Sequence, residues 1–594
     1  MAEEKEIIND FNLKIGGEAG HGILNAGMMF TKACIRGGLY AMSTAIYPSL
    51  IRGGHNHLDV RISDKKIYAN MKAVNLLIAM NKETFDLHKH KLTKGAGVIY
   101  DKDKYPIEEK ELPEGKNIRL YHVPLFDIAM KHGDKIFRNT IALGASFAIV
   151  DFDLDLLNGV LQNTFEKKGE AVVQKNIAVA KEGYDYIKQN YPGKSRFKLK
   201  KGNVHGQLLM SGNEAISVGA VAAGCKFISA YPMTPASSIL SNMAKWEKEY
   251  SIVVKQTEDE LAAINMAIGA NYSGVRGMTC TSGGGFALMA EGFGMAAVME
   301  TPLVVVEAQR PGPGTGMATQ TGQGDLRFML HASTDEFPRI VVAPGDLEQC
   351  FYLTVDAFNF AERYQIPVIV LTDKFLGESY WMTPMFDLSK VKIERGKLLK
   401  EGEVPKDYFR YKLTKDGVSP RAIPGLSNGM HVASSYEHSE KGVENEDRHN
   451  RVAMVEKRWK KFAMLTKEIP DPELIGDENA EITFISWGST KAAIMEAMKE
   501  LKEEEGIASN FLQLTYISPF PEKKVKEVLS KAKLSICVEG NQTGTLAGLI
   551  REHTGKKVKK KLLRFDGRPF FYHQIVRQVK EYLKMDLNEK DMDE

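Results

Sequence analysis

The sequence predicts an α/β protein of three domains, each a largely parallel sheet flanked by helices. Two observations predict this class. Short runs of apolar, often β-branched residues alternate with helical patterns along most of the chain, which is typical of parallel sheets covered on both faces. In addition, a chain of 594 residues is too long to fold around one hydrophobic core. We therefore expect several cores joined by linkers.

The first predicted domain covers residues 1–195. Its strands include "FNLKIGG", "VNLLIAM" and "GVIYD", and "GILNAGMMFTKACIRGG" has the pattern of a helix. The domain ends at the polar, basic stretch "GKSRFKLKKGNVHG", whose composition is that of a linker.

The second predicted domain covers residues 206–386 and has the strongest strand pattern. The buried strands read as "CKFISAYP", "GMTCTSGGG", "PLVVVEAQRPGPG", "RIVVAPGD" and "IPVIVLTD". Gly, Pro, Ser, Thr, Arg and Asp follow these strands. Because ligands bind beyond the carboxyl ends of strands in such sheets, these loops are expected to be functional.

Residues 387–473 lose this periodicity and are predicted to form an extended connection, either functional or mobile. Residues 474–594 form the third predicted domain. It opens with the strand "EITFISWGST" and contains a second strand-turn-helix unit, "LSICVEGNQTGTLAGLI".

Composition argues against several classes of partner and compartment. The 79 Lys and Arg residues nearly balance 76 Asp and Glu residues, so neither nucleic acid nor a membrane surface is an expected partner. The N-terminal residues do not resemble a signal peptide, and no apolar run reaches the ~20 residues of a membrane span. A cytoplasmic protein with reduced core thiols is expected, since its cysteines are widely spaced. They are Cys34, Cys225, Cys280, Cys350 and Cys537.

Two prolines define a rigid turn in "SAYPMTPASSIL". The residues before Pro232 and Pro235 are pushed toward extended geometry, so Tyr231 to Pro235 is predicted to be non-helical. The turn carries Thr234 at its crest, and "SSIL" begins a helix.

Three further loops of the second domain carry candidate residues. Glu258 and Glu260 are both candidates for a buried carboxylate, although acidic residues at a helix start often only complement its dipole. Ser282 and Gly283 open a glycine-rich turn that either admits a ligand or allows close helix packing. Arg310 ends a strand, where its guanidinium is suited to bind a carboxylate through two hydrogen bonds.

The first domain has a glycine-rich turn in "IGGEAGHGI". Its glycines are Gly16, Gly17, Gly20 and Gly22, which is not the dinucleotide-binding register. A phosphate-bearing ligand and a close chain contact explain the turn equally well. His55 and His57 follow in "RGGHNHLDVRIS"; they are expected to be loop or interface histidines, and no metal site is predicted.

Motifs spread over nearly the whole chain resemble the α subunit of 2-oxoacid:ferredoxin oxidoreductases with a γ domain fused at its N-terminus, most closely the 2-oxoglutarate type. The motifs are "GGEAGHGI", "RGGHNHLDVRISD", "SGNEAISVGAVAAGCKFISAYPMTPASS", "EDELAAINMAIGA", "TSGGGFALM", "QRPGPGTG", "GVSPRAIPG" and "VEGNQTGTLAGLIREHTG". The resemblance implies a γ domain associated with coenzyme A, a domain that binds the pyrimidine of thiamine diphosphate, and a domain like the C-terminal domain of transketolase.

The resemblance also implies an activity and partners. Family members decarboxylate a 2-oxoacid with thiamine diphosphate, transfer the acyl group to coenzyme A and reduce ferredoxin. A separate β subunit supplies the Mg²⁺ site for the diphosphate and the [4Fe–4S] cluster, in an (αβ)₂ heterotetramer. The chain is thus expected to be active only with its β subunit, with no nucleic acid or membrane partner. The substrate is expected to be 2-oxoglutarate; pyruvate, branched-chain 2-oxoacids and a non-catalytic coenzyme A or nucleotide-binding role remain alternatives.

Site roles are carried over from the family by position. Glu260, with Glu258 as the alternative, is expected to hydrogen-bond the aminopyrimidine, and Thr234 with Arg310 to bind the substrate carboxylate. The residues expected to line the cofactor site further are Tyr231, Pro232, Ser282 and Gly283. Those expected to contact substrate further are Thr315 and Thr319. Those assigned to coenzyme A are Gly17, Gly20, His21 and Gly22.

The chain departs from the family pattern at three positions. Met233 and Ala236 replace an Ile and a Ser of the usual turn. The loss of a hydroxyl at position 236 weakens any role assumed for it. Gly314 stands where a Ser is usual and is expected to loosen its loop.

Overall fold

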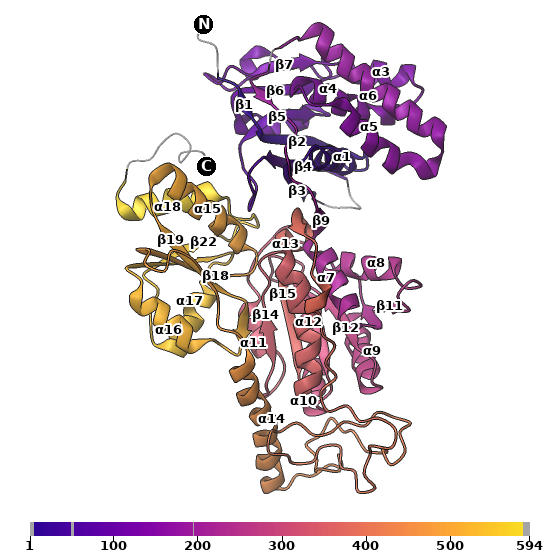
Figure 1. Cartoon of the computed structure of the whole chain (residues 1–594), viewed down its shortest axis with the longest axis vertical. Helices are drawn as coiled ribbons and strands as arrows, with labels where there is room; N and C mark the ends of the chain where they lie inside the picture. The colour runs from indigo at the N-terminus through magenta and orange to yellow at the C-terminus, as the bar shows by residue number, and fades with distance from the viewer. Residues whose placement is uncertain (1–4, 49–52, 194, 586–594) are drawn as a thin grey trace. The chain divides into compact units, whose positions relative to one another are not determined.

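The computed structural model describes residues 5–48, 53–193 and 195–585. They form two compact units of helices and sheets (Figure 1). Unit 1 comprises Met1–Leu209 with Ser379–Met385, and unit 2 comprises Met210–Glu378 with Phe386–Glu594. The α/β class is confirmed. The domain boundaries given above stay a prediction, because unit 2 holds two sheets within one compact unit.

The sheet of unit 1 is parallel on one side and antiparallel on the other. Strands β7, β6, β5 and β2 pair in parallel, whereas β2, β4, β3 and β16 pair antiparallel. In sheet order, the described strands are β7 (Arg119–His122), β6 (Leu92–Tyr100), β5 (Val74–Ala79), β2 (Asp10–Glu18), β4 (His55–Ser63), β3 (Tyr40–Ile46), β16 (Tyr380–Pro384) and β9 (Gln207–Ser211). A separate two-stranded sheet pairs β1 (Ile7–Ile8) with β8 (Phe197–Lys198).

Both faces of this sheet are buried. Successive strand residues point to opposite sides of the sheet, and in β5 the two sets belong to two different cores. Leu76 and Ile78 of β5 belong to the larger core, which includes helix residues such as Phe30 and Ile141. Leu77 and Ala79 pack on the other face with Phe85. The helices are α1 (Ile23–Arg36), α2 (Lys82–His88), α3 (Leu125–Lys131), α4 (Arg138–Ile149), α5 (Leu154–Phe165) and α6 (Glu170–Asn190).

The larger sheet of unit 2 is parallel except at one edge, where β20 pairs antiparallel with β14. Its order is β11 (Val253–Gln256), β10 (Phe227–Ala230), β12 (Gly277–Thr281), β13 (Leu303–Gln309), β15 (Pro367–Asp373), β14 (Ile340–Val342) and β20 (Tyr516–Ser518). The helices between its strands are α7 (Gly212–Ala222), α8 (Ser237–Lys245), α9 (Glu260–Tyr272), α10 (Gly283–Val298), α11 (Leu326–His331), α12 (Leu347–Tyr364) and α13 (Lys374–Glu378). The predicted strands of this region are confirmed.

The C-terminal sheet of unit 2 is also mostly parallel, with β17 antiparallel to β19. Its order is β17 (Leu474–Gly476), β19 (Ser509–Leu514), β18 (Ile482–Trp487), β21 (Leu534–Glu539) and β22 (Lys560–Leu563). Its helices are α15 (Thr490–Glu505), α16 (Glu522–Lys531), α17 (Thr545–Thr554) and α18 (Tyr572–Leu583).

The connection 387–473 contains a long helix, α14 (Arg448–Glu468), that the sequence did not predict. Lysines anchor this helix: Lys457 Nζ lies 2.5 and 2.7 Å from the two carboxylate oxygens of the fully buried Glu300, and Lys461 pairs with the same carboxylate. Because the buried face of α14 presents charged residues, it lacks the apolar stripe by which amphipathic helices are recognised.

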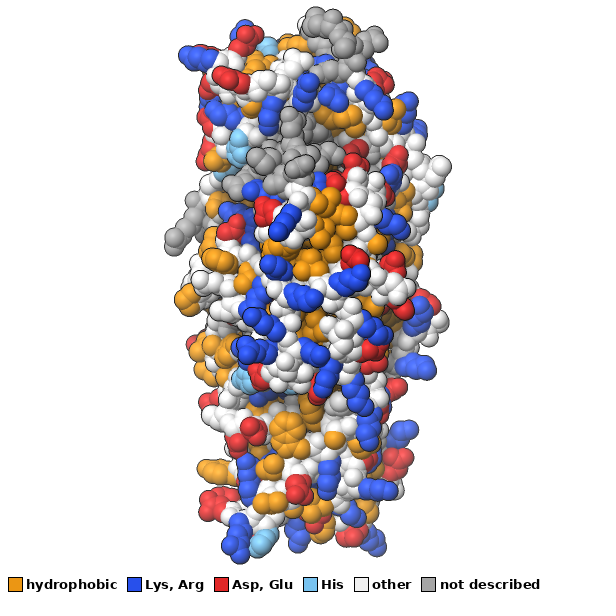
Figure 2. Space-filling model, turned by 90° about the vertical axis from the view of Figure 1, so that its left-hand side faces the viewer, with side chains coloured by type: hydrophobic (Ala, Val, Ile, Leu, Met, Phe, Trp, Pro, Cys, Tyr) orange, Lys and Arg blue, Asp and Glu red, His pale blue; other side chains and the backbone are white. Residues whose placement is uncertain are grey.

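One face of the protein surface carries charged side chains of both signs. Basic and acidic side chains are interspersed with apolar ones over the face drawn in Figure 2. Among the described helices, none has the length and apolar character needed to cross a membrane. All five cysteines are free and buried, which confirms the expected core thiols.

Candidate functional site

The predicted site residues of unit 2 follow neighbouring strands of its larger sheet. Strand β10 leads into the turn at Tyr231, β12 into Ser282 and β13 into Arg310. The strands are parallel, and Thr281 of β12 stands opposite Glu307 of β13. Their carboxyl ends therefore lie at one edge of the sheet, where a doubly wound fold places its ligand.

Arg310 fastens the proline-rich turn through the main chain. Its Nη1 donates a hydrogen bond of 2.7 Å to the carbonyl oxygen of Thr234. The turn is non-helical before α8, as predicted, and both Tyr231 and Pro232 are exposed. The structure thus brings the two predicted carboxylate-binding residues together, with the guanidinium on the Thr234 carbonyl.

The two substituted turn positions have packing roles. Ala236 is fully buried, so its side chain packs in the interior. The sulfur of Met233 lies 3.9 Å from the Thr281 hydroxyl, which donates to it.

Glu260 is the buried member of the two candidate glutamates. It is the first residue of α9, 3% exposed, and its Oε1 is buried without a hydrogen-bond partner among the described residues. Asp259 caps the helix by accepting the Ala262 N–H at 2.7 Å. Burial raises the pKa of Glu260, the Asp259 charge adds to this rise, and the nearby Arg310 opposes it. Glu258 is exposed.

The glycine-rich turn makes room for carboxyl groups. A Cβ at Gly285 would lie 2.6 Å from Glu260 Oε1, and one at Gly283 would lie 2.4 Å from Asp325 Oδ2. Ser282 is fully buried, and its hydroxyl lacks a hydrogen-bond partner within the described part of the chain. The glycines therefore keep space around buried polar atoms, as expected for close approach of a ligand.

Glu307 and Asp325 form a second carboxyl pair that the sequence analysis missed. Glu307 is fully buried in β13, and neither oxygen of its ionised form has a partner among the described residues. Burial raises its pKa well above the ordinary value, and the Asp325 carboxyl raises it further. Protonated Glu307 can donate its O–H to a carboxylate oxygen of Asp325, which gives one of its two oxygens a partner. The acidic residue within the apolar run "VVVEA" could have indicated a buried carboxyl group.

Gln309 positions this pair. Its Nε2 donates to the Thr372 carbonyl oxygen at 3.1 Å, and its Oε1 accepts the Asp325 N–H at 3.1 Å. Burial lowers the pKa of Arg310, while the carboxyls of Asp325, Glu260 and Glu307 oppose that shift. One guanidinium thus faces the field of three carboxyl groups.

The loop after Arg310 adapts to glycine at position 314. Gly314 has a φ of +64°, the left-handed region that glycine adopts without steric cost. This conformation suits glycine better than serine, and the expected loosening of the loop stays a prediction. Thr315 is exposed and Thr319 half-buried, and their expected substrate contacts stay predictions.

The glycine-rich turn of unit 1 separates into packed and open positions. A Cβ at Gly17 would lie 2.8 Å from Ile23 Cδ1, and one at Gly22 would lie 3.1 Å from the Asn139 amide nitrogen, whereas Gly20 has open space. The Asn139 amide donates to the His21 carbonyl oxygen at 2.6 Å. Close packing thus accounts for Gly17, a left-handed φ of +76° accounts for Gly22, and the coenzyme A role stays a prediction.

Replacing Glu307 by Gln is expected to reduce the decrease in folding stability that accompanies rising pH. The raised pKa means that the folded chain holds a proton that the unfolded chain releases at ordinary carboxyl pKa. This contribution is full below the unfolded pKa and is lost as pH rises through the folded pKa. Glutamine imitates the protonated form and does not titrate. Melting temperatures measured from acidic to alkaline pH test this, with the exposed Glu291→Gln as control; a Glu307→Gln profile parallel to that of wild type contradicts it.

Three family models match consecutive parts of the chain. Residues 12–186 match pyruvate ferredoxin/flavodoxin oxidoreductase. Residues 218–457 match the thiamine diphosphate-binding part of pyruvate flavodoxin/ferredoxin oxidoreductase. Residues 480–575 match core domain II of pyruvate:ferredoxin oxidoreductase. The models follow the order of the three main sheets.

Related proteins agree with the family models. The α subunit of a 2-oxoacid:ferredoxin oxidoreductase from a Sulfolobus species is 33% identical over 96% of each chain. A 2-oxoglutarate synthase subunit KorA from Methanothermobacter thermautotrophicus is 34% identical over 56% of this chain and 88% of its own. The solved 2-oxoglutarate:ferredoxin oxidoreductase from Magnetococcus marinus, with 2-oxoglutarate, coenzyme A and succinyl-CoA bound, is 33% identical over 96% of this chain and 99% of that one, with a TM-score of 0.90. The chain thus belongs to the 2-oxoacid:ferredoxin oxidoreductase family, as an α subunit.

Proposed function

We propose that this α subunit acts with a β subunit to convert 2-oxoglutarate and coenzyme A to succinyl-CoA and CO₂, with reduction of ferredoxin. The observation that carries the proposal is Glu260, a buried carboxyl group with an unpartnered oxygen in a space that Gly285 keeps open. The Magnetococcus relative, described with 2-oxoglutarate and succinyl-CoA, supports this substrate.

The residues present suit the pyrimidine end of thiamine diphosphate. Glu260 offers an oxygen that can hydrogen-bond a ring nitrogen, and its raised pKa allows it to share a proton there. Ser282 offers a second buried, unpartnered oxygen at the same edge. When bound, thiamine diphosphate supplies the nucleophilic carbon and the electron sink that decarboxylation of a 2-oxoacid requires. The proposed β subunit supplies Mg²⁺ and the [4Fe–4S] cluster.

Arg310 and Thr234 are proposed to orient the 2-oxoacid. The guanidinium is half-buried and already holds one rigid loop, so its direction is fixed before substrate binds. A carboxylate placed against it gains charge-assisted hydrogen bonds in a partly desolvated site. This intact group of side chains argues against the non-catalytic alternative.

Glu260→Gln is expected to lower kcat by roughly 100-fold or more, the scale of a lost acid–base group. Glutamine cannot exchange a proton with a ring nitrogen, although its size is nearly the same. The reconstituted α and β subunits would be assayed for dye reduction, and thiamine diphosphate affinity measured separately. Glu258→Gln is the matched control because that neighbouring side chain is exposed. Equal effects of the two variants would remove Glu260 from its proposed role.

Arg310→Ala is expected to raise KM and lower kcat, with a loss of roughly 100-fold in kcat/KM, or about 2.7 kcal/mol. Both the substrate carboxylate and the Thr234 carbonyl lose a cationic donor. Arg327→Ala serves as control, since Arg327 forms a surface ion pair with Glu552. Unchanged kinetics of the Arg310 variant would refute the carboxylate role.

The substrate assignment is tested by comparing kcat/KM of the purified α and β subunits on 2-oxoglutarate, pyruvate and 2-oxoisovalerate. We expect the highest value with 2-oxoglutarate. A clear preference for either of the other acids would replace 2-oxoglutarate while leaving the reaction class intact. Absence of coenzyme A-dependent turnover with all three would refute the proposed function itself.

A further inference from the structure

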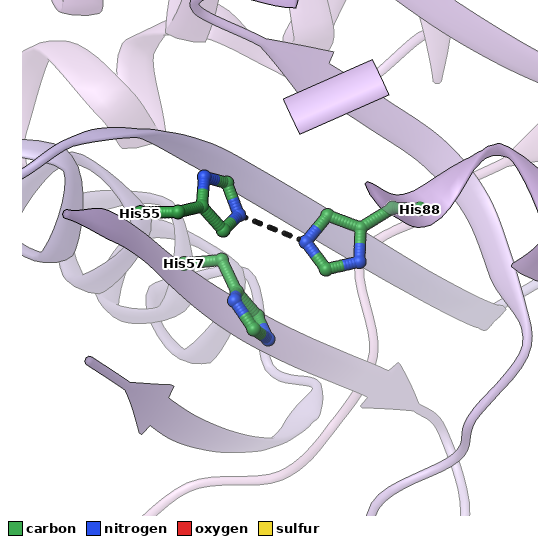
Figure 3. A group of neighbouring side chains, drawn as sticks. All are labelled: His55, His57 and His88. Atoms are coloured by element: carbon green, nitrogen blue, oxygen red, sulfur yellow. Dashed lines mark hydrogen bonds between the residues drawn. The ribbon is translucent and has the colours of Figure 1, made fainter. Parts of the chain in front are cut away.

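Three histidines converge within unit 1. His55 and His57 are alternate residues of β4 and therefore project from the same face of the sheet. His88 ends α2, which follows β5, the strand that pairs with β2 on the side away from β4. Figure 3 shows the three rings gathered together, with His55 Nε2 and His88 Nε2 2.9 Å apart. One ring nitrogen from each histidine lies within 4.8 Å of the others.

A glycine makes this convergence possible. Gly16 of β2 pairs with His57 across the antiparallel ladder. A Cβ at Gly16 would lie 2.9 Å from His55 Cε1 and 2.7 Å from Thr84 Cγ2 of α2. Any larger residue would push helix and ring away from the strand. The fold thus leaves space for rings from two elements to meet.

The ring nitrogens are buried and short of partners. His57 is 7% exposed and His88 is 4% exposed. The Nδ1 atoms of all three rings are buried without a hydrogen-bond partner among the described residues. Buried polar atoms of this kind are costly unless a ligand or water satisfies them. The cluster therefore holds buried ring nitrogens that no described residue hydrogen-bonds and that remain available to a ligand.

The surroundings favour neutral imidazoles, the form that binds metals. Burial lowers the pKa of each of the three rings, and the charge of Lys14 lowers them further. Lys14 forms a buried ion pair with Asp59. Asp59 Oδ2 lies 3.9 Å from His57 Nε2, so a carboxylate stands beside the cluster as a counter-charge.

We propose that His55, His57 and His88 bind one borderline divalent transition metal ion, with Zn²⁺ as the reference, and that a solvent molecule completes its coordination. Tetrahedral Zn²⁺ with Zn–N bonds of about 2.0–2.1 Å separates its ligand atoms by ~3.3 Å. That separation falls between the observed 2.9 Å and the 4.8 Å limit, so small side-chain rotations suffice.

The ligand chemistry selects the class of metal. Three imidazole nitrogens suit Zn²⁺, Cu²⁺ or Ni²⁺, whereas Mg²⁺ and Ca²⁺ require oxygen ligands. The bound ion would tie β4 to α2 and so stabilise unit 1. This site is separate in residues and chemistry from the thiamine diphosphate site proposed for unit 2.

The test uses the full-length chain, stripped with a chelator and titrated with ZnCl₂. We expect one tightly bound zinc ion per chain and a rise in melting temperature on zinc addition. His57→Gln and His88→Gln are each expected to weaken zinc binding by roughly 100-fold and to abolish the rise in melting temperature. His90→Gln is the matched control, because His90 is exposed two residues beyond His88. Failure of the wild-type chain to bind zinc, or equal loss in the control, overturns the proposal.

A second measurement needs no variant. X-ray absorption of the zinc-loaded wild-type chain is expected to give nitrogen ligands at about 2.0–2.1 Å. Sulfur ligands at about 2.3 Å would assign the metal to cysteines and would overturn the proposal. Because neither measurement uses substrate turnover, their outcome is independent of the proposed enzymatic function.

Discussion

Parallel pairing of β10, β12, β13 and β15 is the constraint on which the candidate site depends. Parallel strands all end at the same edge, so loops distant in sequence meet there. The register is specific: Thr281 stands opposite Glu307, and Gln309 opposite Asp373. A shift of one residue would turn Glu307 and Gln309 to the other face of the sheet. The position of Arg310 at the end of β13 follows from this pairing.

Burial converts that edge from a polar surface into a site with unusual acid–base properties. Glu260, Glu307 and Asp325 all act electrostatically on the Arg310 guanidinium, and burial raises the pKa of each carboxyl group. A low effective dielectric makes it costly to ionise all three, which favours the protonated forms of these carboxyl groups. Gly283 and Gly285 allow this crowding because a side chain at either position would strike a carboxyl oxygen. The site therefore combines a fixed cation with groups able to hold protons.

Buried charges also anchor the part of the chain that lacks regular strands. Glu300 receives Lys457 and Lys461 of α14, and Glu362 pairs with Arg276 and Arg421. A buried pair is costly to break because it leaves an uncompensated charge. Ion pairs thus attach α14 and the segment around Arg421 to buried carboxylates of unit 2, and whether the connection is functional or mobile stays a prediction.

The sequence by itself determined the strand pattern, the non-helical turn before α8 and the end of a strand at Arg310, because these depend on local periodicity and on proline geometry. The resemblance to a known family pointed to Glu260 and left Glu258 open. Tertiary structure buried Glu260 and left Glu258 exposed, since burial depends on how the start of α9 packs against the rest of the domain. Only the tertiary structure shows that Glu307 lies beside Asp325 and that His88 lies beside His55 and His57. Contacts between residues far apart in sequence are set by strand register and helix packing, which no local pattern encodes.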